Sequence, residues 1–260
     1  MTNDELDRAL RQLRLGGMAD TLTVRAQQAR ADTLGPTDFL GLLVHDELQR
    51  RRDRVIERRV KAAGFRDRTS LDGFDWTFNR IDRALVFELA TTRFVEQRED
   101  CLLLGNPGCG KSRIAQALGM AAIHAGFNVL YREAHRLFED LVLAEATGDR
   151  AAEIARLVEI PLLIIDDLGM RKLPASAAED LLEIVMRRYE RASTIITSNR
   201  PLEDWAKMFG DTPAVAAFLD RLMHHAHFIE IRGKSYRLHE SSKSGRRRQA
   251  KNPDEEKGGV

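Results

Sequence analysis

Residues 101–112 read CLLLGNPGCGKS, and this stretch decides the fold. Its last eight residues match the pattern G-x-x-x-x-G-K-[ST] in full. An apolar segment that predicts a strand precedes the pattern, and an amphipathic segment that predicts a helix over residues 112–125 follows it. In such a loop the glycines let backbone N–H groups turn towards phosphate oxygens, and the helix N-terminus adds the positive end of its dipole. The stretch therefore predicts a phosphate-binding loop between a strand and a helix.

The chemistry of this loop assigns a task to two of its side chains. We expect Lys111 to neutralise the β- and γ-phosphates of a nucleoside triphosphate and Ser112 to bind Mg²⁺ through its hydroxyl. Cys109 occupies a variable position of the pattern and no His and Asn partners are evident, so we expect no catalytic thiol there. The predicted nucleotide-binding residues of the loop are Gly105, Asn106, Pro107, Gly108, Cys109, Gly110, Lys111 and Ser112.

A pair of carboxylates, Asp166 and Asp167, forms the second signal, directly after the apolar run PLLII of residues 161–165. In an open α/β sheet, ligands bind at the carboxyl ends of the strands. We expect Asp166 to hold the Mg²⁺ shell through water, and Asp167 to orient and activate an attacking water molecule. Two aspartates after an apolar run often mark only a strand end, but their position downstream of a phosphate loop favours the functional interpretation.

Two polar residues nearer the C-terminus complete the candidate site. Asn199 follows the apolar segment 193–197, where it would contact the γ-phosphate or the attacking water; the alternative is an ordinary turn before Arg-Pro. Arg221 lies in a predicted helix, and an arginine from a neighbouring subunit can stabilise the transition state of phosphoryl transfer; the alternative is a local salt bridge. No Cys or carboxylate set accompanies the histidines of the H-H-x-H run, so we predict no metal site at His224, His225 and His227.

Beyond the loop, short apolar segments alternate with amphipathic ones. This alternation predicts an α/β fold in which a parallel sheet carries helices on both faces. The predicted strands span residues 101–104, 128–131, 161–165 and 193–197, and the predicted helices span residues 82–95, 112–125, 134–146 and 175–191.

The first 68 residues predict a small all-helical domain. Gly16–Gly17 and Gly35–Pro36 separate three helical patterns, the last of them over residues 38–59. The apolar residues expected to pack in this domain are Leu6, Leu10, Leu13, Leu15, Leu22, Val24, Phe39, Leu40, Leu43, Leu48 and Val55. The opposite face of the third helix is basic, which suits either an anionic polymer or plain solvation. Its basic residues are Arg50, Arg51, Arg52, Arg54, Arg58, Arg59 and Lys61.

The remaining segments complete the predicted organisation. Residues 69–80 are expected to form a linker that packs on the next domain, residues 81–240 the nucleotide-binding domain, and residues 241–260 a disordered charged tail. The chain has a net charge of +1 and 43% hydrophobic residues, as ordinary globular proteins do. It has two cysteines, no signal-peptide pattern and no long apolar run, so we expect a cytoplasmic protein without a membrane span.

Taken together, these motifs resemble those of AAA+ ATPases, and more narrowly those of the IstB-type transposition helper ATPases, which are bacterial relatives of the DnaC and DnaI helicase loaders. The resemblance extends to about residue 240. It rests on LRLGGMADTL (13–22), DGFDWTF (72–78), GNPGCGKS (105–112), LLIIDDLG (162–169), TSNRP (197–201) followed by Asp204–Trp205, and FLDRLMHHAHFIEIRGKSYRL (218–238).

The resemblance implies further roles for individual residues. Asn199 falls at the sensor-1 position, and Arg221 falls at the position of an arginine finger that acts in a neighbouring subunit. Arg237 matches a sensor-2-like arginine. Phe74 and Trp76 fall in the linker that flanks the nucleotide base in such proteins.

The function implied by the resemblance is that of an ATP- and Mg²⁺-dependent helper of a transposase. Such a protein assembles as a ring or spiral on duplex DNA, largely without regard to sequence, selects or remodels the target, recruits the transposase, and is reset by hydrolysis. The DNA contacts would come from Arg50, Arg51, Arg52, Arg58 and Arg59. The alternatives are a replicative helicase loader, a nucleotide-gated binding module with vestigial hydrolysis, and a small-molecule kinase.

Overall fold

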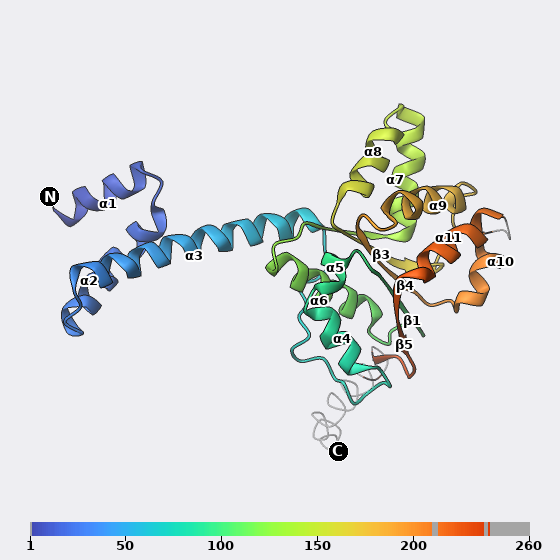
Figure 1. Ribbon diagram of the computed structural model, residues 1–260, viewed down its shortest axis with the longest axis horizontal. Helices are drawn as coiled ribbons and strands as arrows, with labels where there is room; N and C mark the ends of the chain where they lie inside the picture. Colours follow the sequence, from blue (N-terminus) through green and yellow to red (C-terminus); the bar gives the residue numbers. More distant parts are fainter. Residues whose placement is uncertain (1, 210–212, 237–238, 240–260) are drawn as a thin grey trace, which may run out of the picture. The chain divides into compact units, whose positions relative to one another are not determined.

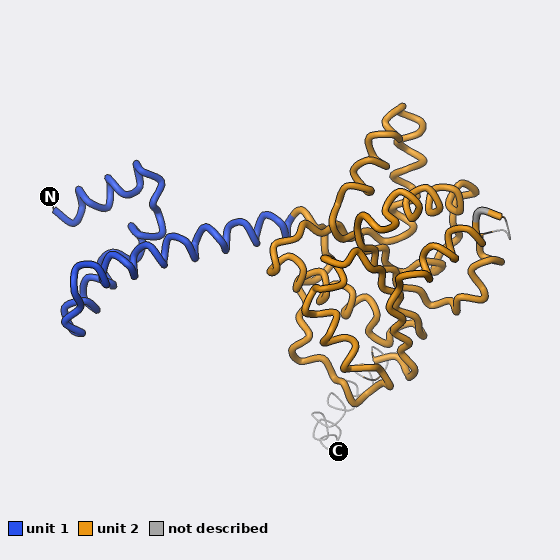
Figure 2. Tube along the Cα trace, in the orientation of Figure 1, with its two compact units in different colours: residues 1–61 blue, residues 62–260 orange. Residues whose placement is uncertain are grey.

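The computed structural model describes residues 2–209, 213–236 and 239. Its contacts divide the chain into two compact units, residues 1–61 and residues 62–260 (Figure 2). The division falls a few residues before the boundary at residue 68 that the sequence predicts, so residues 62–80 lie with the second unit. Within the described residues, none of the helices combines the length and the apolar character needed to cross a membrane.

The first unit consists of helices α1 (Asn3–Gln12), α2 (Gly16–Ala31) and most of α3 (Pro36–Ala63). Helix α1 begins with a capping box, in which the Thr2 hydroxyl accepts from the Glu5 N–H and the Glu5 carboxylate accepts from the Thr2 N–H. The small core is formed by Met18, Leu22 and Leu43, with Leu6, Leu10, Leu15 and Phe39 packed against it.

Helices α2 and α3 approach each other closely at Gly17. A Cβ atom at Gly17 would lie 2.7 Å from the Cα atom of Glu47, so only glycine fits. The buried Glu47 carboxylate accepts from the Gly17 N–H and from Arg51. The glycine pair that the sequence assigns to a helix break therefore also lets two helices come together. Four residues expected in the core are instead exposed, namely Leu13, Val24, Leu40 and Leu48.

A five-stranded parallel sheet in the order β2-β3-β4-β1-β5 forms the centre of the second unit (Figure 1). The strands are β1 (Asp100–Gly105), β2 (Val129–Glu133), β3 (Leu162–Leu168), β4 (Ser193–Ser198) and β5 (Ala226–Ile231). Strand β1 lies between β4 and β5, with Leu104 opposite both Ser198 and Glu230. The carboxyl ends of β1, β3 and β4 therefore meet at one edge of the sheet.

Helices cover both faces of this sheet, which confirms the predicted fold class. Helix α6 packs on four strands and is itself covered by α4, while α7 packs on β2 and β3 beside α8 and α9. The larger core joins the sheet to α7, α8, α9, α10 and α11 and contains the fully buried Trp205 and Phe218. The helices are α4 (Arg83–Ala90), α5 (Arg93–Gln97), α6 (Lys111–His124), α7 (Ala134–Thr147), α8 (Arg150–Glu159), α9 (Ala177–Arg188), the 3₁₀ helix η1 (Leu202–Asp204), α10 (Trp205–Phe209) and α11 (Pro213–His224).

Several predicted elements differ from the structure. The single helix expected over residues 82–95 is wrong, because Thr92 adopts a left-handed conformation with φ of 67° that separates α4 from α5. Helix α8 and strand β5 were not predicted at all. Strand β3 is longer than predicted and includes both aspartates of the acidic pair, with an irregular register against β4 between Ile165 and Leu168.

Candidate active site

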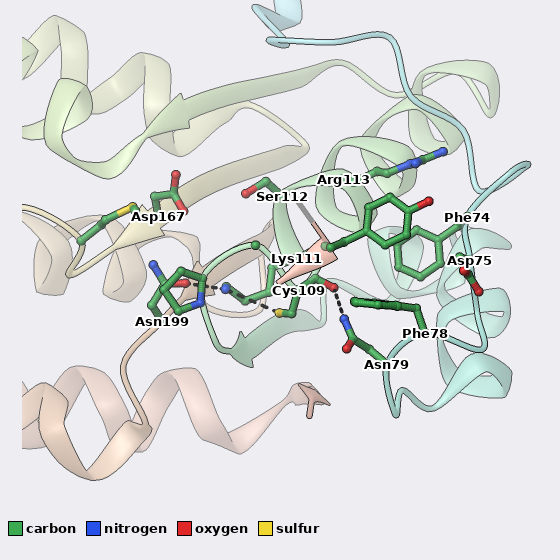
Figure 3. Close-up of a pocket in the computed structure, with 15 residues that line it drawn as sticks. Phe74, Asp75, Phe78, Asn79, Cys109, Lys111, Ser112, Arg113, Asp167 and Asn199 are labelled. Carbon is green, nitrogen blue, oxygen red and sulfur yellow. Dashed lines mark hydrogen bonds between the residues drawn. The ribbon is translucent and has the colours of Figure 1, made fainter. Parts of the chain in front are cut away.

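The phosphate-binding loop connects β1 to α6, as its motif predicts. Two of its glycines are required by the backbone. Gly105 has φ of 151°, and a Cβ atom there would lie 2.4 Å from the Ile231 carbonyl oxygen of β5. Gly110 has φ of 107° and immediately precedes α6, so it turns the chain into the helix. Figure 3 shows the pocket that this loop borders, with Lys111 and Ser112 between Asp167 and Asn199 on one side and Phe74 and Phe78 on the other.

Lys111 is buried in the first turn of α6 and is surrounded by oxygen atoms. Its ammonium group donates to the carbonyl oxygens of Gly105 (2.8 Å) and Asn106 (2.9 Å) and to the side-chain oxygen of Asn199. Burial lowers the pKa of Lys111, while Cys109 and the two aspartates of β3 oppose this shift. The side chain therefore places a desolvated positive charge where the loop and β4 meet, next to the carboxylates of β3.

Asp166 is completely buried at the carboxyl end of β3, where two hydroxyl groups satisfy its carboxylate. The Tyr131 hydroxyl of β2 donates to one oxygen and the Thr197 hydroxyl of β4 donates to the other. Burial and the neighbouring Asp166 charge raise the pKa of Tyr131, which keeps it a neutral donor. The two neighbouring strands thus fix the first carboxylate of the acidic pair inside the sheet.

Asp167, in contrast, reaches the pocket. Its φ of 58° is unusual for a residue other than glycine, and its N–H donates to the Thr197 hydroxyl at 2.9 Å. The two consecutive side chains therefore have different surroundings, with Asp166 in the core and Asp167 at the pocket. Burial, together with the charge of Asp166, raises the pKa of Asp167, while Arg66 and Lys111 lower it.

Asn199 follows β4 and lines the pocket beside Lys111, as predicted (Figure 3). The turn that carries it is anchored by Ser198, whose hydroxyl donates to the Leu168 carbonyl at 2.8 Å and accepts from the Arg200 N–H. The Asn199 side chain is therefore positioned between the loop lysine and the acidic pair, which suits contact with a terminal phosphate or an attacking water.

The opposite wall of the pocket comes from the linker segment, as expected for Phe74. A Cβ atom at Gly110 would lie 3.0 Å from the Phe74 ring, so this ring covers the loop directly. The Arg113 guanidinium carbon lies 5.7 Å from the centre of the same ring. Trp76 does not line this pocket and instead stacks between Phe74 and Phe87. The wall provides a flat apolar surface of the kind on which a base stacks.

Sequence reasoning missed several residues of this site. Thr197 and Tyr131 hold Asp166 in place, yet each is an ordinary strand residue in the sequence. Phe78 and Asn79 also line the pocket, and the Asn79 amide donates to the carbonyl oxygens of Cys109 and Lys234. Asn79 therefore fastens the phosphate loop to a distant part of the chain. The aromatic residues of the linker provided a signal for Phe78, whereas no local pattern identifies the other three.

The oxygen atoms at the pocket fit a magnesium ion that arrives with phosphate. The Ser112 hydroxyl and the Asp167 carboxylate both line the pocket, and such hard oxygen ligands are those that Mg²⁺ prefers. Asp166 does not line it and has a hydroxyl donor on each oxygen, so its contact with a metal shell would run through water. Within the part of the chain that the structure describes, no cluster of three His, Cys, Asp or Glu side chains offers a metal site.

Of the two arginines expected to act at the site, the structure describes one. Arg221 is exposed on α11, outside the pocket, with its guanidinium carbon 5.2 Å from the centre of the Tyr189 ring. Arg237 lies outside the described residues. The three histidines have separate partners, because His224 bonds Tyr189, His225 lies near Glu190 and His227 pairs with Glu99.

The candidate DNA-contacting arginines of α3 fall into two groups. Arg50 pairs with Asp20, and Arg51 pairs with Glu47 and donates to the Arg14 carbonyl oxygen. These two side chains therefore contribute to the packing of the helices of the first unit. Arg52 and Arg58 are exposed on the same helix, and Arg59 is half-buried.

We predict that Thr197→Val destabilises the second unit, because it removes a donor to the buried Asp166 and the acceptor for the Asp167 N–H at nearly constant volume. The free energy of unfolding should fall by about 1–3 kcal/mol. Urea unfolding followed by tryptophan fluorescence measures this, since both tryptophans, Trp76 and Trp205, lie in the second unit. Thr197→Ser retains the hydroxyl and should lose less; a Val variant as stable as the parent would contradict the assigned bonds.

Comparison with solved structures shows proteins of the same fold. DnaI is 24% identical, with a TM-score of 0.53, and the match covers 63% of this chain and 91% of DnaI. AMPPCP-bound DnaA from Aquifex aeolicus is 20% identical, with a TM-score of 0.55, over 71% of this chain and 56% of DnaA. These likenesses show that the second unit shares the fold of these proteins.

Comparison of sequences identifies the family. A protein of Pseudomonas aeruginosa that is named as an ATP-binding protein of insertion sequence IS21 is 37% identical over 242 residues, which are 93% of this chain and 91% of that protein. A protein of Geobacillus stearothermophilus, named likewise for insertion sequence IS5376, is 34% identical over 88% of this chain and 91% of its own length. The sequence profile of one family matches residues 8–244. The chain belongs to the IstB-like ATP binding protein family.

Proposed function

We propose that this protein binds and hydrolyses ATP and serves a transposase as a DNA-binding helper. One observation carries the proposal. The phosphate loop, Lys111, Asp167 and Asn199 come from three separate strand ends and line one pocket, whose far wall is the Phe74 ring (Figure 3). Nucleotide binding and hydrolysis need these groups together, and related proteins of this family are named for ATP binding.

Each side chain of the pocket has a distinct task in this proposal. The loop N–H groups and Lys111 hold the β- and γ-phosphates, for which Lys111 exchanges its carbonyl contacts for phosphate oxygens. Ser112 would ligate Mg²⁺ and Asp166 would support its water shell, and the bound ion would supply positive charge at the phosphates. Phe74 supports the base.

Hydrolysis requires a water molecule aligned with the γ-phosphate, and Asp167 and Asn199 lie where they would hold it. Asp167 accepts a proton from the water, and its raised pKa makes it a better base than a solvated aspartate. Asn199 fixes the water or a γ-phosphate oxygen by hydrogen bonding. Catalysis of this kind rests on positioning and electrostatics, which the rigid ends of β3 and β4 provide.

Among the described residues that line the pocket, Arg113 is the one arginine, and its guanidinium lies against the Phe74 ring. Arg221 is exposed on α11 and projects from a different part of the unit, so we assign it to the active site of a neighbouring subunit. Contacts of this head-to-tail type generate rings or spirals. Arg237 is proposed as a further phosphate contact by resemblance alone.

The duplex-DNA part of the proposal rests on the first unit. Arg52 and Arg58 are exposed on α3 and suit contacts to phosphates, which supply affinity without sequence information. Arg59, which is less exposed, is a further candidate for a phosphate contact. Arg50 and Arg51 would first have to break their ion pairs with Asp20 and Glu47. Relatives named for insertion sequences favour a transposase as the partner, acting in the bacterial cytoplasm, over the helicase that a loader would serve.

The first test is ATP turnover by the purified protein with and without duplex DNA, together with sedimentation to follow assembly. We expect turnover that duplex DNA stimulates several-fold and large assemblies that require both ATP and DNA. Arg52→Ala/Arg58→Ala should weaken DNA binding and its salt dependence while leaving DNA-free turnover unchanged. Turnover that ignores duplex DNA, without assembly, would point instead to a loader that awaits a helicase.

A mixing experiment tests the division of labour between subunits. Asp167→Asn and Arg221→Ala should each reduce turnover at least about 100-fold, since each removes one half of every active site. Mixing the two variants should restore a fraction of the activity, because some interfaces then pair an intact Asp167 with an intact Arg221. A mixture as inactive as its components, although the variants co-assemble, would show that Arg221 does not act in a neighbouring subunit.

A further inference from the structure

Arg66 reaches the acidic end of the pocket from the segment that follows α3. Its guanidinium contacts the Glu133 carboxylate at the end of β2, and its Nη2 atom lies 3.6 Å from the Asp167 Oδ2 atom. In the sequence Arg66 is one of many basic residues in this region, and it is not part of the phosphate loop or of the acidic pair. The structure singles it out as a cation shared by two carboxylates.

The segment that carries Arg66 is fixed to the phosphate-loop helix. The N–H groups of Arg66 and Asp67 both donate to the Gln116 side-chain oxygen of α6, at 3.0 and 3.1 Å. The Gln116 amide in turn donates to the carbonyl oxygen of Ser112, the residue that would ligate the metal. The Phe65 ring fills the space over Gly119, where a Cβ atom would lie 2.9 Å away. These contacts hold the backbone of Arg66 in a fixed position relative to the helix that follows the phosphate loop.

The Arg66 side chain is 39% exposed, whereas the carboxylates of Glu133 and Asp167 are largely buried, at 11% and 20%. Solvent at the guanidinium screens these ion pairs, so their direct contribution to stability is small. The excess of negative charge around Asp167 gives Arg66 a more specific role. Asp167 has Asp166 and Glu133 as acidic neighbours, and its other cationic neighbour, Lys111, is the one that would turn to the phosphates. A triphosphate adds more negative charge at this place.

We propose that Arg66 is a positioning residue for Asp167: its guanidinium, braced on Glu133, holds the Asp167 carboxylate and compensates its charge when the triphosphate enters. The inference rests on the proposed function in one respect, that Asp167 faces the terminal phosphate.

A double-mutant cycle on nucleotide affinity tests the proposal without requiring hydrolysis. The probe is a fluorescent, non-hydrolysable ATP analogue with Mg²⁺, titrated into the full-length protein. Arg66→Ala should weaken binding at least about threefold when Asp167 is present, since the charge of the Asp167 carboxylate is then uncompensated. In the Asp167→Asn background the same change should alter binding less than about twofold. Arg66→Lys should recover most of the affinity, because it retains the charge.

Arg156→Ala is the matched control, since Arg156 forms a comparable surface ion pair with Glu153 and is 44% exposed. It should leave the affinity unchanged in both backgrounds. An equal loss for Arg66→Ala in both backgrounds would mean that Arg66 acts on the fold or on the nucleotide directly, and would overturn the proposal. No loss in either background would overturn it as well.

Turnover of ATP, measured on the same samples, separates this inference from the proposed function. Coupling in the binding cycle without any wild-type turnover would support Arg66 as the partner of Asp167 and contradict hydrolysis. Wild-type turnover without coupling would support hydrolysis and contradict the role of Arg66 as the partner of Asp167. A parent protein that does not bind the analogue would contradict both.

Discussion

Two consecutive carboxylates at the end of one strand have to lie in different surroundings, and the site depends on this constraint. A regular strand already points alternate side chains to opposite faces of the sheet. It would, however, keep the backbone of both residues in the regular hydrogen-bonding pattern with the neighbouring strands. Here the register of β3 against β4 is broken, Asp167 takes a left-handed conformation, and the Thr197 hydroxyl bonds both residues. Asp166 becomes part of the core, and Asp167 lines the pocket.

The charges around the pocket follow from that arrangement. Burial of Asp166 without its hydroxyl partners would cost several kcal/mol, so Tyr131 and Thr197 make the acidic pair possible. Two cations compensate the negative charge of Asp167, namely Lys111 from the phosphate loop and Arg66 from the segment after α3. Lys111 lies in the first turn of α6, which packs on the sheet, and Arg66 lies in a segment that is hydrogen-bonded to the same helix.

Much of the site could be predicted from the sequence because most of its residues belong to short contiguous motifs. The loop, the acidic pair and Asn199 each follow an apolar strand, and parallel strands bring their carboxyl ends to one edge. The resemblance of the linker predicts a contact of Phe74 with the base, and Phe74 lines the pocket. The α/β fold followed from the same alternation, although Thr92 divided one predicted helix where no glycine or proline gives warning.

The remaining residues escaped prediction because long-range contacts select them. Asn79 bonds the Lys234 carbonyl 155 positions away, and nothing near Asn79 in the sequence indicates that contact. Strand β5 alternates buried Ile229 and Ile231 with exposed Phe228 and Glu230, a weaker signal than an apolar run. In the first unit, Leu40 and Leu48 follow the helical stripe yet are exposed, whereas Phe39 and Leu43 of the same helix pack in the small core.

The most direct test of the account is calorimetric titration of Mg–ATP into the protein and into its Lys111→Ala variant. The account predicts saturable binding of one nucleotide per chain, weakened at least about tenfold by the loss of the ammonium group that faces the phosphates. Absence of binding by the parent protein, or equal affinity of the variant, would contradict the assignment of this pocket to a nucleoside triphosphate.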